Sequence, residues 1–483
     1  MAKSIKVNFL YNILLNISKV IFPLITAPYV ARVLEPDGVG LFNFAFNYAN
    51  YFAFFAALGI PFYGIREIAK IKDDRTEQEK FVSEVISISL VATIVSVIIF
   101  LLSLWLVPQL NENYVIFLVS GIILYISPIK IDWYYSGKEE FGYITFRSLI
   151  IKTLSVLCLF IFVHDKDDLL LYVCLNAGCN ALNEVWNYVK LYSSGIHPYF
   201  TLSGTRHLKP LFILFSSNIA ISIYVVLDTL MLGFLTDYTE VGYYNSATHV
   251  SKAFIPIVTS LAAVVLPRIS VMRENNQLEE INTLMNKSFS IVGFLSFPLA
   301  IGLITIAPVF VPLFFGDQFM GTITPLIIVS LLIIIIGFNN LTGVQVLLGF
   351  GLDKNFLYSI VAGASSNFIL NMVLIPYLGA SGAAISSVFA EIVVLGTMLY
   401  YIYKLTPVRF NCKKELVFNL LVSLVFLLIG RAVFTYVPGW LGVGVTAICC
   451  TIFYVVAQYL LKSSSEQELL RIIGSKLGHK RIV

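Results

Sequence analysis

The sequence predicts an all-α polytopic membrane protein, and three observations support this fold class. Of the 483 residues, 58% are hydrophobic and only 12% are charged, whereas soluble domains carry about 25% charged residues. Apolar runs of about 20 residues, the length that crosses a bilayer as a helix, follow one another along the whole chain. The third observation is an internal repeat, in which residues 39–45 return in modified form 202 residues later.

About 14 transmembrane helices are predicted from the apolar runs. A closed β-barrel is excluded because its strands would appear as short segments of alternating polarity. The connections are short, and none has the length of a folded domain outside the membrane. The predicted spans are 8–33, 41–65, 82–107, 113–135, 143–163, 169–192, 210–235, 241–266, 285–315, 322–349, 355–377, 381–403, 415–436 and 439–461.

Positive charges are distributed unevenly over the connections. Alternate connections, together with both ends of the chain, hold about 23 lysines and arginines, and the remaining connections hold only Arg32, Lys166 and Arg431. Because cytoplasmic segments are enriched in these residues, the first set is predicted to be cytoplasmic, as are both termini. The tail 462–483 combines a capping box with spaced apolar residues, which favours an amphipathic helix on the inner leaflet. A frayed solubilising tail is the alternative.

The repeat predicts two homologous six-helix bundles in the same orientation, because an even number of spans restores the side of the membrane. Val39–Ala45 and Val241–Ala247 share the pattern Val-Gly-x-aromatic-Asn-x-Ala, and each copy opens the second span of a six-span block. Glu184 and Glu391 also correspond, each in a sixth span. The predicted domains are 1–205 and 206–404 for the bundles, 405–461 for two additional helices and 462–483 for the cytoplasmic tail.

A polar stripe lies within the repeated segment. Asn43, Asn47 and Asn50 are spaced i, i+4 and i+7 in an otherwise apolar run, so they share one face of a helix. Amides in membrane helices also serve as hydrogen-bonding contacts between helices, and this alternative stays open for each of them. The same register in the second copy holds Asn245, His249 and Lys252.

Charged residues occur inside or at the ends of several spans. A charge at the bilayer centre costs about 2.5–3.5 kcal/mol on insertion scales, so each needs a reason. Lys19 and Lys252 lie over two turns from the span ends, which predicts a water-filled cationic cavity in front of them. Asp228 either pairs with a cation or carries a proton or sodium ion during transport. Three arginines near span ends either join the cavity or extend to the interface: Arg32, Arg66 and Arg268.

A cationic cavity favours an anionic ligand. Lysine and arginine bind phosphate or pyrophosphate, and amides and tyrosines bind sugar hydroxyls. The chain contains no phosphate-binding Gly-x-x-x-x-Gly-Lys-Ser/Thr loop, no His-Glu-x-x-His motif and no cysteine cluster. We therefore predict a transporter that is not an enzyme, with no catalytic residue, metal, cofactor or nucleic-acid partner, and with H⁺ or Na⁺ as its coupling ion.

Three segments resemble the bacterial polysaccharide and O-antigen flippases. Residues 22–45 are similar to the opening signature of that family, and Tyr63–Ala69 and Asp228–Tyr244 continue it. The family belongs to the multidrug/oligosaccharidyl-lipid/polysaccharide exporter superfamily, and the resemblance covers residues 1–404. Glu35 stands where the family more often has glycine, and we expect this change to be tolerated in a loop.

The resemblance implies two six-helix lobes in a V, with alternating access to a central cavity. It implies that undecaprenyl-pyrophosphate-linked oligosaccharide, a repeat unit of O-antigen or another surface polysaccharide, moves from the cytoplasmic to the periplasmic leaflet of the bacterial inner membrane. The polysaccharide polymerase machinery is the implied protein partner. Lys19, Arg66 and Lys252 match the type of the family's cationic lumen residues. A cation-coupled drug or small-molecule exporter of the same superfamily and a membrane glycosyltransferase or ligase are the alternatives.

Overall fold

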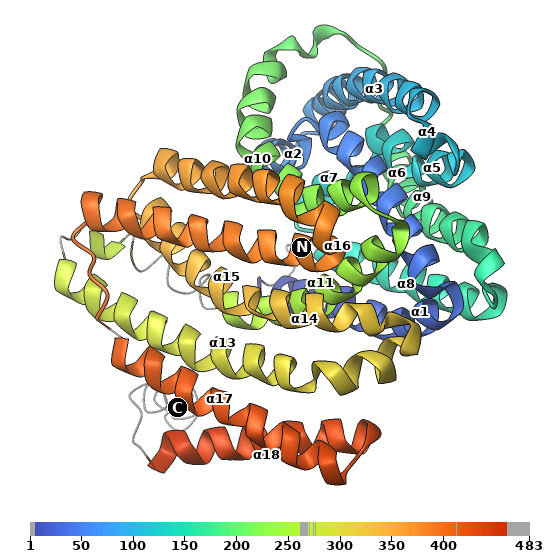
Figure 1. Cartoon of the computed structure of the whole chain (residues 1–483). Helices are drawn as coiled ribbons and strands as arrows, with labels where there is room; N and C mark the ends of the chain where they lie inside the picture. Colours follow the sequence, from blue (N-terminus) through green and yellow to red (C-terminus); the bar gives the residue numbers. More distant parts are fainter. Residues whose placement is uncertain are drawn as a thin grey trace. The chain divides into compact units, whose positions relative to one another are not determined.

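The architecture comes from a computed structural model of the chain, which describes residues 5–260, 269, 271–273, 275, 277–411 and 413–460. Regular secondary structure in these residues is entirely helical (Figure 1). Eight helices in the described part are long and apolar enough to cross a membrane. The predicted fold class, an all-α polytopic membrane protein, is confirmed. The tail predicted as an amphipathic helix, 462–483, lies outside the described residues.

The chain divides into two compact units, Met1–Gly242 and Tyr243–Val483. Helix α10, which the sequence analysis assigned to the second bundle, lies within the first unit. The homology of two six-helix bundles stays a prediction. The first unit contains α1 (Ile5–Ala57), α2 (Ile60–Lys70), α3 (Arg75–Leu106), α4 (Pro108–Asn111), α5 (Tyr114–Ser120), α6 (Ile122–Tyr125), η1 (Ser127–Ile129), α7 (Asp132–Gly137), α8 (Phe141–Phe162), η2 (Lys166–Asp168), α9 (Leu169–Ser193), η3 (Ser203–His207), α10 (Leu208–Leu235) and the start of α11 (Tyr238–Thr259).

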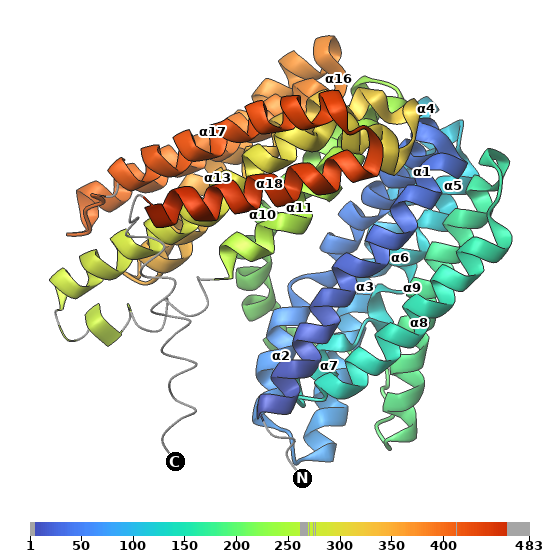
Figure 2. The same ribbon diagram turned by 90° about the horizontal axis from the view of Figure 1, so that it is seen from below.

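The second unit contains most of α11 and the helices that follow it. Helices α17 and α18 lie along α13 in both views (Figure 2). Apolar side chains fill this contact, and Tyr454 Oη donates to the carbonyl oxygen of Phe294 at 2.9 Å. The two additional helices therefore pack on the second unit. Its elements are α13 (Leu278–Phe315), η4 (Asp317–Thr322), α14 (Ile323–Ser330), α15 (Leu332–Asn340), the π-helix η5 (Leu341–Leu348), α16 (Asp353–Leu405), α17 (Lys413–Tyr436) and α18 (Gly439–Leu460).

Three predicted spans differ from single helices in the structure. The range 41–65 is divided between α1, which ends at Ala57, and α2, which begins at Ile60. The range 113–135 is divided among α5, α6, η1 and α7. Pro128 lies in η1 and cannot donate a backbone hydrogen bond, while Lys130 Nζ donates to the carbonyl oxygen of Ile123 at 2.7 Å. This side-chain bond satisfies a carbonyl left free by the broken helix. The range 322–349 is divided among α14, α15 and η5.

Helix α1 holds the predicted span 8–33 and most of 41–65, and it is interrupted at Glu35. This residue has φ 57° and ψ 174°, a conformation that is essentially restricted to glycine, and Pro36 follows it. The interruption falls in the predicted connection between 8–33 and 41–65. Helix α16 of the second unit likewise covers two predicted spans, 355–377 and 381–403. It is interrupted between them at Gly379, with φ 51°.

The two Val-Gly copies of the repeat pack closely against each other's flanking backbone within the first unit. A Cβ atom on Gly40 would lie 1.6 Å from the carbonyl oxygen of Tyr238, and one on Gly242 would lie 2.2 Å from the carbonyl oxygen of Pro36. Because Tyr238 and Gly242 follow Pro36 and Gly40 at the repeat spacing of 202 residues, the two contacts are reciprocal. Only glycine permits this approach at either position.

The segment between α9 and α10 is bound along α3. Ser83 Oγ and Ser87 Oγ, one turn apart, accept the backbone N–H groups of Tyr199 and Thr201 at 3.1 and 2.9 Å. Further along the segment, Arg206 Nη2 donates to the buried Glu84 carboxylate at 2.8 Å, and His207 Nε2 lies 2.7 Å from the same oxygen. These contacts fix the start of α10.

We predict that Gly40→Ala and Gly242→Ala each destabilise the protein by about 3 kcal/mol, because the new methyl group forces the two backbones apart. The measurement is thermal unfolding of the purified protein in detergent, with monodispersity checked by size-exclusion chromatography. Gly178→Ala on α9 is the control, since nothing lies within 4 Å of its Cβ position. Equal melting temperatures for Gly40→Ala and Gly178→Ala would contradict the close contact.

We predict that Glu35→Gly raises the stability by about 1 kcal/mol. Relief of a backbone strain of about 1–3 kcal/mol outweighs the conformational entropy that glycine loses on folding, about 0.5–1 kcal/mol. The same thermal measurement applies. Asp37→Gly is the matched control, because Asp37 has no positive φ and should lose stability on substitution. A lower melting temperature for Glu35→Gly would show that the glutamate side chain stabilises the interruption.

Candidate functional site

The predicted amide stripe lies on the second part of α1 and is partly hydrogen-bonded within that helix. Asn43 Nδ2 donates to the carbonyl oxygen of Val39, and Asn47 Nδ2 donates to that of Asn43, both at 2.8 Å. All three stripe amides are half-buried. The NH₂ groups of Asn43 and Asn47 are therefore already hydrogen-bonded to the backbone of α1. A sugar hydroxyl would approach their side-chain oxygens instead.

A cavity of about 220 Å³, whose wall is mostly apolar, is lined in part by the third amide of the stripe. Asn50 shares its wall with Ser89, Ser127 and Lys130. Trp133 and Phe54 supply aromatic surface. Sequence reasoning missed Lys130, although a lysine inside the predicted span 113–135 was a usable signal. The cavity combines a cation, hydroxyls, an amide and an aromatic ring, which is the chemistry that recognises anionic or sugar groups.

Lys19 is exposed on the first part of α1 and belongs to a short polar row. Its Nζ donates to Asn16 Oδ1 at 3.5 Å, and Asn16 Nδ2 donates to Asn12 Oδ1 at 3.0 Å. A second lysine that sequence reasoning missed lies close by, because Lys152 Nζ on α8 donates to Ser18 Oγ at 3.0 Å. The two ammonium groups interact electrostatically. The first unit thus contains a pair of lysines from two different spans.

The remaining candidates of the first unit lie apart from this pair. Arg32 is exposed and donates through Nη1 to the carbonyl oxygen of Pro28 at 3.4 Å. Arg66 is also exposed, with Nε 3.0 Å from Glu67 Oε1 and its guanidinium 5.5 Å from the centroid of the Tyr63 ring. Asp228 is buried on α10, with 7% of its surface exposed.

The second unit holds the other copy of the stripe on α11. Asn245 is half-buried, whereas His249 and Lys252, one turn apart, are exposed and interact electrostatically. Arg268 lies outside the described residues. The candidate residues belong to two different units. That they line a single cavity therefore stays a prediction.

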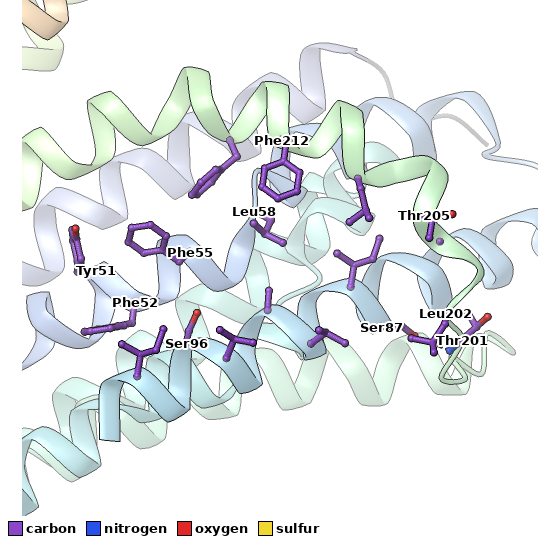
Figure 3. A pocket seen from close by; sticks show the side chains of 18 residues that line it. Tyr51, Phe52, Phe55, Leu58, Ser87, Ser96, Thr201, Leu202, Thr205 and Phe212 are labelled. Atoms are coloured by element: carbon purple, nitrogen blue, oxygen red, sulfur yellow. Dashed lines mark hydrogen bonds between the residues drawn. The ribbon is translucent and has the colours of Figure 1, made fainter. Parts of the chain in front are cut away.

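A larger cavity, of about 680 Å³, lies within the first unit and is almost entirely apolar (Figure 3). Its wall comes from the second part of α1, from α3 and from the segment that leads into α10. Aromatic side chains gather toward one end, where Tyr51 and Phe52 lie, and the hydroxyl groups of Ser87, Thr201 and Thr205 lie toward the other. Such a lining accommodates a hydrocarbon chain with a polar group at one end.

Comparison with known proteins identifies relatives over most of the chain. A family model described as "Polysaccharide biosynthesis protein" matches residues 5–273. The "Putative O-antigen transporter" of Escherichia coli (strain K12) is 27% identical over 406 residues, which cover 83% of this chain and 97% of that protein.

Two solved structures share the fold. A lipid II flippase, MurJ, in an inward closed conformation has a TM-score of 0.75 at 17% identity, over 94% of this chain and 98% of that chain. A multidrug resistance MATE family transporter of the MOP superfamily, in an inward-facing conformation, has a TM-score of 0.62 at 14% identity, over 80% and 94% of the two chains. At these identities the likeness concerns the fold.

Proposed function

This chain belongs to the polysaccharide biosynthesis protein family, and we propose that it is a flippase that moves a lipid-linked oligosaccharide across the membrane. The expected substrate is undecaprenyl-pyrophosphate carrying a repeat unit of O-antigen or another surface polysaccharide. It would travel from the cytoplasmic to the periplasmic leaflet of a bacterial inner membrane, with both termini of the protein in the cytoplasm. Alternating access driven by a coupling ion, H⁺ or Na⁺, is the proposed mechanism.

The observation that carries this proposal is the occurrence of lysines within the predicted membrane-spanning segments of both units. Lys19 and Lys152 belong to the first unit, and Lys252 belongs to the second. Burying such charges in hydrocarbon is costly, so their presence favours a hydrated cavity and an anionic ligand. A pyrophosphate group fits this requirement, because it offers several oxygen acceptors to ammonium groups.

The two cavities of the first unit support an amphiphilic substrate. The side chains of Asn50 and Lys130 in the smaller cavity offer contacts for a sugar or phosphate group, and the larger apolar cavity between α1, α3 and α10 offers contacts for a hydrocarbon chain. A relative named as an O-antigen transporter, aligned along 97% of its own length, supports the same substrate class. A drug exporter is the second candidate, but carboxylates rather than lysines would then be expected to dominate the cavity.

Deletion of the gene is expected to leave the lipid-linked repeat unit on the cytoplasmic leaflet, because its synthesis continues while its transfer stops. The measurement is mass spectrometry of extracted lipid-linked glycans, combined with their accessibility to a membrane-impermeant probe in right-side-out vesicles. A complementing copy of the gene is the control and should restore the wild-type level. Normal amounts of surface polysaccharide in the deletion strain would contradict the proposal, and sugar transfer by the purified protein would indicate an enzyme instead.

Lys19→Ala and Lys252→Ala are each expected to lower the transport rate about ten- to hundredfold. Each removes one charge-assisted hydrogen bond to the pyrophosphate, worth about 1.5–3 kcal/mol. The measurement is translocation of a labelled lipid-linked oligosaccharide in proteoliposomes that contain equal amounts of folded protein. Lys354→Ala, an exposed lysine in the first turn of α16, is the control and should transport normally. Unchanged rates for both lysine variants would refute a cationic binding site at these positions.

A further inference from the structure

Four ionisable side chains from separate elements of the first unit meet beyond the amide stripe. Lys130 follows η1, Asp132 begins α7, Arg147 lies on α8 and Glu184 lies on α9. Arg147 Nη2 donates to Asp132 Oδ1 at 2.8 Å. Asn187 Nδ2 lies 2.7 Å from the same Asp132 oxygen and 3.3 Å from Glu184 Oε2. The cluster therefore contains two cations and two carboxyl groups joined by one amide.

The two carboxyl groups are stabilised unequally. Asp132 accepts a close hydrogen bond from a guanidinium and another from an amide, and half of its side chain is exposed. Glu184 is half-buried, and among the described side chains only Asn187 donates to it, at the longer distance. Lys130 Nζ donates to the Ile123 carbonyl oxygen at 2.7 Å. Hydrogen bonds to a carboxylate favour its charged form, and Glu184 receives one long bond where Asp132 receives two short ones.

Arg147 provides a second, independent observation. Its side chain is 3% exposed, yet Nε and Nη1 have no hydrogen-bond partner among the residues that the structure describes. Buried donors without an acceptor are costly, so this guanidinium requires an oxygen atom such as that of water. Lys130 also lines the 220 Å³ cavity that Asn50 lines, so the cluster borders, at Lys130, a space large enough for water.

The charges around Glu184 select a proton over a metal cation. The groups that face it electrostatically are Asp132 on α7, Arg147 and Tyr143 on α8, and Lys130 beside η1. Two fixed cations offset the two carboxylates, so the cluster offers a sodium ion no net electrostatic attraction. A proton instead becomes part of the carboxyl group and needs no additional oxygen ligands. With both carboxylates ionised the four charges cancel, and one bound proton gives the cluster a net charge of +1.

We propose that the Glu184 carboxyl group is a proton-binding site used in the transport cycle, an inference that rests on the proposed flippase function. A proton passes from water to one oxygen of the carboxylate, which becomes a carboxylic acid, and it returns to water when the acid ionises. In the sequence, Glu184 is distinguished only as the counterpart of Glu391 in the internal repeat. Its partners Asp132, Arg147 and Lys130 become visible in the folded first unit.

The first experiment detects the proton directly in the purified full-length protein. Infrared difference spectra between acidic and alkaline pH should show a carboxylic-acid C=O stretching band that is absent from Glu184→Gln. Glu140→Gln is the matched control, because Glu140 lies on the same unit but forms an ion pair with Lys190 at 2.6 Å. Glu184→Asp retains the carboxyl group and should restore the band with a shifted titration midpoint. A wild-type band in Glu184→Gln, or an unshifted midpoint in Glu184→Asp, would overturn the proposal.

The second experiment tests the use of this proton in transport. In proteoliposomes, an imposed pH gradient should accelerate oligosaccharide translocation by the wild type and by Glu140→Gln. Glu184→Gln should keep gradient-independent exchange but lose this acceleration. Acceleration of Glu184→Gln equal to that of the wild type would overturn the proposal, as would a sodium gradient that acts through Glu184. Absence of any translocation by the wild type would refute the flippase function, while the infrared band would still report the proton site.

Discussion

The close approach of two glycine-containing backbone segments is the constraint on which the first unit depends. Gly40 and Gly242 occupy equivalent positions of the repeat, and each faces the backbone beside the other. The contact joins the interruption of α1 to the turn between α10 and α11. Nearby, Gly233 of α10 packs on the ring of Phe44, and Gln109 Nε2 donates to the Gly233 carbonyl oxygen at 2.6 Å. Small residues let helices approach where lipid supplies no hydrophobic driving force between them.

Polar interactions fix the connection between α9 and α10 on α3. Ser83 and Ser87 accept hydrogen bonds from its backbone, and Glu84 contacts the two basic residues that precede α10. These three α3 side chains are buried, and an unpaired buried polar group is costly, so each bond also selects one arrangement of the chain. The start of α10, the helix that carries Asp228, is defined in this way.

The distribution of polar and apolar space within the first unit agrees with an amphiphilic substrate. The larger cavity is almost entirely apolar, with the hydroxyl groups of Ser87, Thr201 and Thr205 toward one end, and the smaller cavity has Asn50 and Lys130 in its wall. The lysine pair formed by Lys19 and Lys152 adds positive charge on neighbouring spans. The proposed lipid-linked substrate gives these features a common interpretation, in which a charged head group and a hydrocarbon tail contact separate surfaces.

The sequence by itself determined the membrane class, most of the helical ranges and the repeat, because composition, apolar length and spacing are local properties of the chain. It also identified the amide stripe from its helical period. Only the tertiary structure decided that Gly40 and Gly242 make reciprocal contacts, that Glu35 has a strained backbone, and that α5 to α7 replace a single span. The cluster around Glu184 likewise required the fold. Its members lie on four elements, and no local pattern relates side chains that come together only when distant helices pack.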